Sequence, residues 1–62
     1  MTPWRRISDT MYRLDDVWTV REDEDGWWRA YRAYDRLLGR FAEVNDAMLE
    51  AERLRKEDEG YR

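Results

Sequence analysis

The dipeptide Asp25-Gly26 constrains the fold of this 62-residue chain more than any other feature. It lies between two runs rich in aromatic and β-branched residues, Val17–Glu22 and Trp27–Tyr34. Residues of these types suit the pleated surface of a sheet, and glycine accepts the positive φ that a tight hairpin turn requires. The sequence therefore predicts an antiparallel β-hairpin.

The register of this hairpin decides which side chains share a face. Pairing Asp23 with Trp27 places Val20 opposite Ala30 and Trp18 opposite Arg32. Because side chains alternate along a strand, each face then carries a fixed set of residues. One face carries Trp18, Val20, Trp28, Ala30 and Tyr34, and the other carries Val17, Thr19, Arg21, Trp27, Arg29, Tyr31 and Ala33. A slip of one residue would exchange the two faces.

The chain after the hairpin contains a turn, a short strand and a helix. Asp35-Arg36 is typical of a turn, and Leu37–Phe41 then forms a third strand. Glu43–Glu59 is an amphipathic helix ending before Gly60, because its apolar residues recur at helical spacing. These residues are Val44, Ala47, Met48, Ala51 and Leu54. We therefore expect an α+β fold, with about three antiparallel strands and one C-terminal amphipathic helix.

The expected domain spans residues 17–59, between an N-terminal arm over 1–16 and a tail over 60–62. We expect an arm that Trp4 or Ile7 ties to the domain, and two alternatives give it regular structure. Ser8-Asp9 could cap a short helix over Thr10–Asp15, or Tyr12–Leu14 could add an edge strand.

An all-α fold is the alternative to the sheet. A heptad-like spacing of apolar residues would make Trp27–Glu59 one long helix, in a helical hairpin or a coiled coil. The residues at this spacing are Trp27, Tyr31, Tyr34, Leu38, Phe41 and Met48. Gly39 would cost such a helix about 1 kcal/mol relative to alanine.

One set of residues resembles a known arrangement over about Val17–Leu54. The set comprises Asp25-Gly26, Trp28, Gly39-Arg40-Phe41, Ala47 and Ala51. It is similar to the three-stranded-sheet-plus-helix modules of phage tyrosine integrases, their arm-type DNA-binding domains. In that family the exposed sheet face enters a DNA groove. The resemblance implies that Arg21, Arg29 and Arg40 occupy this face.

The composition excludes several kinds of chemistry. The chain has no histidine and no cysteine, so it has no Cys/His zinc site and no Ser–His or Cys–His nucleophile. The acidic run Glu22–Asp25 lacks the ligand spacing of a calcium loop, and a module this small can hardly build a hydrolytic cleft. We expect no enzymatic activity, no catalytic residue, no metal and no cofactor.

The net charge of −3 disfavours generic binding to nucleic acid, which needs a positive footprint. No apolar run approaches the roughly 20 residues that cross a bilayer, and no signal peptide is evident. We expect a cytoplasmic protein without a membrane partner. Its eleven arginines against one lysine suggest a GC-rich bacterial or phage genome.

One helix covers only one face of such a sheet, so the other face meets water or a partner. Trp, Tyr and Arg predominate among interface hot spots, and the expected partner-binding residues are Arg21, Trp27, Arg29, Tyr31, Leu38 and Arg40. The sequence thus predicts a small protein-binding module, a phage or bacterial regulator that acts on a host protein.

Three alternatives for the uncovered face remain. The same face could bind DNA as an accessory protein, or it could be buried in a homodimer. The third alternative is that the arm folds across it, using Trp4, Ile7 and Met11.

Overall fold

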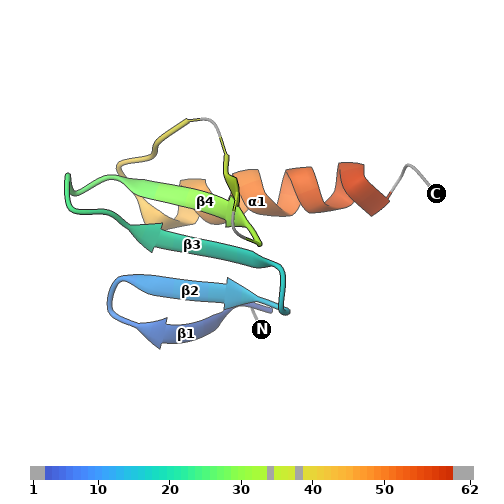
Figure 1. Cartoon of the computed structure of the whole chain (residues 1–62), viewed down its shortest axis with the longest axis horizontal. Helices are drawn as coiled ribbons and strands as arrows, with labels where there is room; N and C mark the ends of the chain where they lie inside the picture. Colours follow the sequence, from blue (N-terminus) through green and yellow to red (C-terminus); the bar gives the residue numbers. More distant parts are fainter. Residues whose placement is uncertain (1–2, 34, 38, 60–62) are drawn as a thin grey trace.

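The protein is a five-stranded antiparallel sheet with one C-terminal helix (Figure 1). The structure is a computed structural model that describes residues 3–33, 35–37 and 39–59. The strands are β1 (Arg5–Ser8), β2 (Met11–Leu14), β3 (Trp18–Glu22), β4 (Trp28–Arg32) and β5 (Asp35–Arg36), and the helix is α1 (Val44–Glu59). The α+β class and the C-terminal helix are confirmed. The sheet has more strands than expected, and the all-α alternative is wrong because the chain over β4 is extended.

The central hairpin has the predicted register. Val20 pairs with Ala30 and Trp18 with Arg32, and the Asp23 amide donates a 3.0 Å hydrogen bond to the Trp27 carbonyl. Gly26 closes the loop with a φ of 83°. This conformation strains residues that carry a Cβ, which explains glycine at this position.

The first sixteen residues contribute two strands that extend the sheet beyond β3. Leu14 and Trp4 are 3% and 7% exposed and belong to the core, whereas Ile7 is 45% exposed. The segment expected as an arm therefore does not fold across the uncovered face, and no short helix forms over Thr10–Asp15. The alternative of a strand near Tyr12–Leu14 is confirmed by β2, although β1 is the edge.

The segment after β4 turns earlier than predicted. Ala33 has a φ of 53°, and the residues expected as a turn form β5 instead. The Leu37 amide donates to the Ala30 carbonyl at 3.0 Å, and Phe41 bridges Trp28. Leu37 and Phe41 are thus four residues apart in the chain, whereas the β4 residues that they contact, Ala30 and Trp28, are only two apart. A continuous third strand over Leu37–Phe41 is therefore wrong.

The helix packs on β3 and β4 through small residues. Ala47 and Ala51 are fully buried. The small side chains of these two alanines let α1 approach Val20 and Ala30, which are also buried. The helix begins at Val44, one residue later than expected. The predicted apolar stripe is confirmed, since its other members also pack against this core.

Two ion pairs join the helix to the sheet, one at the turn between β2 and β3 and one at β4. The Arg55 guanidinium lies 3.3 Å from Asp15, and that of Arg32 lies 2.9 Å from Asp58. Both pairs are partly exposed to solvent, so they add little to the stabilisation that the buried core provides.

Candidate functional site

The sheet face opposite α1 is the candidate site, and we call it the open face. Its members follow from the register, which pairs them across neighbouring strands. They are Arg5, Met11, Arg13, Thr19, Arg21, Arg29, Tyr31 and Arg36. Each of the five strands contributes one arginine to this face. None of the secondary-structure elements in the described part of the chain lies over it.

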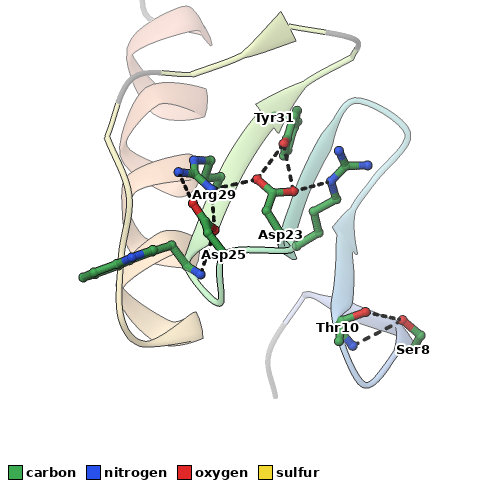
Figure 2. Close-up of polar contacts among 8 residues, drawn as sticks. Ser8, Thr10, Asp23, Asp25, Arg29 and Tyr31 are labelled. Carbon is green, nitrogen blue, oxygen red and sulfur yellow. Dashed lines mark hydrogen bonds and ion pairs between the residues drawn. The ribbon is translucent and has the colours of Figure 1, made fainter.

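Asp23 organises one end of the open face (Figure 2). Its carboxylate accepts hydrogen bonds from Arg29 Nη1 at 3.0 Å and from Arg21 Nε at 3.1 Å. The Tyr31 hydroxyl donates to the same carboxylate at 3.0 Å, and the Arg21 guanidinium lies 4.6 Å from the Tyr31 ring centroid. The side chains of Asp23 and Arg29 are only 18% and 14% exposed. The cluster therefore holds three open-face side chains in defined positions.

Asp25 secures the hairpin loop to β4. Arg29 binds it in a bidentate manner, with N–O distances of 2.9 and 2.8 Å. The Trp27 amide also donates to Asp25, at 3.1 Å. The Arg29 hydrogen bonds, and then that of the Trp27 amide, lower the pKa of Asp25 from its ordinary 3.8 to about 2. Asp25 thus remains charged well below neutral pH.

The pKa of Asp23 reflects two opposing effects. Partial desolvation raises it, but hydrogen bonds from Arg29, Tyr31 and Arg21 outweigh that effect and lower the pKa below its ordinary value. The pKa of Arg29 is raised, first by its hydrogen bonds to Asp25 and then by those to Asp23. These charges are therefore held in their ionised forms by one another.

Three open-face arginines lie outside this cluster. Arg5, Arg13 and Arg36 are exposed, and none forms an ion pair with another described residue. Arg13 lines a shallow hollow of about 250 Å³ whose walls also include Met11, Thr19, Tyr31 and Ala33. The open face thus combines hydroxyl and apolar surface with arginines that form no ion pair with another described residue, although Asp15 and Asp16 line the same hollow as Arg5 and Arg13.

Trp27 and Arg40 form a separate contact beside the open face. The Arg40 guanidinium lies 4.6 Å from the centroid of the Trp27 ring, a cation–π geometry. Arg40 also lines a hollow of about 410 Å³ together with Arg29, Arg36, Leu37 and Gly39. This hollow continues the positive surface from β4 and β5 towards the start of α1.

The structure brings together three of the predicted binding residues, Arg21, Arg29 and Tyr31, around Asp23. It places Trp27 and Arg40 against each other, and Leu38 lies outside the described residues, as does Tyr34. The expected partner-binding residues did not include Asp23, Asp25, Arg5, Arg13 or Arg36. The alternation of Arg13 with the apolar residues Tyr12 and Leu14 could have predicted that Arg13 lies on the open face. The position of Arg36 depends on the unexpected turn at Ala33.

The described residues contain neither a metal-binding cluster nor a membrane-spanning helix. None of their His, Cys, Asp and Glu side chains form a group of three that could hold a metal ion. Among the same residues, no helix has the length and apolarity needed to span a bilayer.

Comparison with protein families, with curated proteins and with solved structures finds no match for this chain.

Proposed function

We propose that this chain is a non-enzymatic protein-binding module whose partner docks on the open face. The observation that carries this proposal is the preorganised cluster of Arg21, Arg29 and Tyr31 around Asp23, on the face opposite α1. Side chains that are already ordered lose little conformational entropy on binding. Arginine and tyrosine are also types that dominate interface hot spots. Both points favour a surface built for contact with another protein.

Such a module would act by occupying a surface of its partner. We propose a cytoplasmic regulator of phage or bacterial origin that acts on a host protein. The excess of arginine over lysine supports the origin. A homodimer through the open face is compatible with the same surface.

The test compares two variants that add bulk without changing charge. Thr19→Tyr fills the open face, whereas Leu49→Tyr adds the same ring on α1, at a side chain that is 63% exposed. Immobilised wild-type protein and both variants are incubated with a bacterial lysate, and retained proteins are identified by mass spectrometry. Each candidate is then purified, and its dissociation constant for the three chains is measured.

We expect a host protein that binds wild type and Leu49→Tyr but is lost with Thr19→Tyr. Thermal unfolding of both variants establishes that each is folded. Equal retention by the two variants, or no retained protein, would contradict docking on the open face.

DNA binding is a second candidate function, because every strand places one arginine on the open face. Contacts between arginine and phosphate release counterions, so such binding weakens steeply with salt, with a log–log slope of about −0.9 per contact. The net charge of −3 opposes it. We expect no measurable duplex binding near physiological salt, and micromolar binding there would favour the DNA function instead.

A further inference from the structure

We infer that the open face receives an acidic segment of the partner protein, an extended stretch with carboxylates that meet Arg5, Arg13 and Arg36. This inference rests on the proposed protein-binding function and specifies the chemistry of its partner.

The first argument is the balance of charge on the open face. Asp23 and Asp25 engage Arg21 and Arg29 through hydrogen bonds of 2.8–3.1 Å. The other three arginines form no ion pair with another described residue. An arginine fork matches a carboxylate in a bidentate manner. The open face therefore offers three guanidinium groups that form no ion pair with another described residue, although the whole chain is acidic.

The second argument is the arrangement of these forks. Arg5 pairs with Arg13, Arg13 with Thr19, Thr19 with Tyr31, and Tyr31 with Arg36, so these residues form one row across all five strands. Neighbouring strands lie about 4.8 Å apart, which separates the backbones of Arg13 and Arg36 by roughly 14 Å. An extended peptide advances about 3.4 Å per residue. Two carboxylates four residues apart would therefore reach both arginines.

The third argument concerns the surface between the arginines. Thr19 and Tyr31 occupy the middle of the row, and Met11 and Ala33 line the adjoining hollow. This surface suits uncharged side chains that alternate with carboxylates in a peptide. Duplex DNA instead presents one negative charge per roughly 1.7 Å of its axis, and these charges would approach the Asp23 carboxylate. The arrangement thus favours an acidic peptide over a continuous polyanion.

The experiment uses three synthetic peptides of about nine residues. The first has Glu at every fourth position with Ser and Thr between, and the other two replace Glu by Gln or by Lys. Each is titrated into the isotope-labelled full chain, and amide chemical shifts are recorded. We expect the Glu peptide to shift amides around Arg13, Thr19, Tyr31 and Arg36. The Gln peptide should bind about tenfold more weakly or worse, because charge-assisted bonds are lost.

Two double variants with equal charge change provide the matched comparison. The first variant, Arg13→Glu with Arg36→Glu, reverses the charge of two side chains on the open face. The second variant, Arg53→Glu with Lys56→Glu, reverses the charge of two side chains on α1. The open-face variant should lose the Glu peptide and gain affinity for the Lys peptide. The α1 variant should bind the Glu peptide within about twofold of wild type, because the affected charges lie across the sheet and are screened by salt.

Several outcomes would overturn the inference. They are equal binding of the three peptides, retained Glu-peptide binding by the open-face variant, or tighter binding of duplex DNA than of the Glu peptide. Self-association of wild type that the open-face variant abolishes would assign the face to a second copy instead. If the Glu peptide fails but a host protein still depends on Thr19, the acidic partner is wrong and the proposed function stands. If the Thr19→Tyr variant loses no partner, the proposed function itself fails.

Discussion

Asp23 and Arg29 lie six residues apart in the chain and meet across the β3–β4 hairpin, with Arg29 Nη1 3.0 Å from Asp23 Oδ2. Arg29 also binds Asp25, so one guanidinium engages two of the three carboxylates in the loop between β3 and β4. The acidic loop is thereby anchored to the sheet instead of being repelled from it. The same contacts fix the positions of Arg21 and Tyr31 on the open face.

Substitution of Asp23 should reveal this anchoring. Asp23→Asn removes the charge that Arg29 and Arg21 share, in a site where the Asp23 side chain is only 18% exposed. Hydrogen bonds to charged groups contribute roughly 1.5–3 kcal/mol, and we expect a loss of about 1–2 kcal/mol because Arg29 retains Asp25. Urea denaturation measures the change. Glu24→Gln, at an exposed position in the same loop, is the control. An equal loss in both variants would show that the contacts of Asp23 do not stabilise the fold.

The lowered pKa of Asp25, about 2 against an ordinary 3.8, predicts a specific pH dependence. A carboxyl whose pKa is lower in the folded state stabilises the fold above its unfolded pKa, and this contribution is lost as pH falls through the folded pKa. The difference in stability between wild type and Asp25→Asn should therefore be constant above about pH 4 and shrink towards pH 2. Denaturation curves at intervals across this range test the sign. A difference that stays constant down to pH 2 contradicts the assignment.

Gly26 should be sensitive to substitution for backbone reasons alone. Its φ is 83°, and a Cβ added there would meet no atom within 4 Å. Gly26→Ala should cost about 1 kcal/mol, since residues with a Cβ disfavour this conformation. Gly26→Asn should cost less, because asparagine tolerates it better. Thermal unfolding of both variants decides the matter, and an Asn variant that is less stable than the Ala variant would argue against a backbone origin.

The strands β1 and β2 should be required for folding. Leu14 is 3% exposed in the core, and Leu14→Ala should cost about 2–5 kcal/mol. Ile7→Ala is the control on the edge strand, where the side chain is 45% exposed and the loss should be much smaller. A shortened chain that begins at Val17 should show no cooperative unfolding. If it unfolds cooperatively, the first two strands are dispensable for the core.

The sequence predicted those elements whose signals are both local and repeated. The Asp25-Gly26 turn and the alternation of Trp18 and Val20 determine the hairpin register, and five apolar positions at helical spacing determine α1. The turn signal occurs once but lies between two runs of strand-forming residues, whereas the helical signal recurs over five positions. These features were confirmed.

The remaining differences have physical reasons. All four residues of β1 are exposed, so no alternation marks it, and β2 offers only Tyr12 and Leu14 as apolar alternates. The turn after β4 places Ala33 at a positive φ. Alanine rarely adopts this conformation, so the residue type did not predict a turn there. The Asp23 cluster depends on contacts between residues six and eight positions apart, which become visible only when the two strands are paired.

The order of strands in the sheet, β1-β2-β3-β4-β5, is the order of the strands in the chain. Every pairing therefore closes a short loop, and the entropy lost on closing a loop is smallest when the loop is short. Proteins dominated by such local contacts fold faster than those that pair distant segments. During synthesis each new strand would find its neighbour already outside the ribosome, so the sheet can grow in step with translation. Of the described elements, α1 alone follows the five strands in the chain, and it packs on β3 and β4.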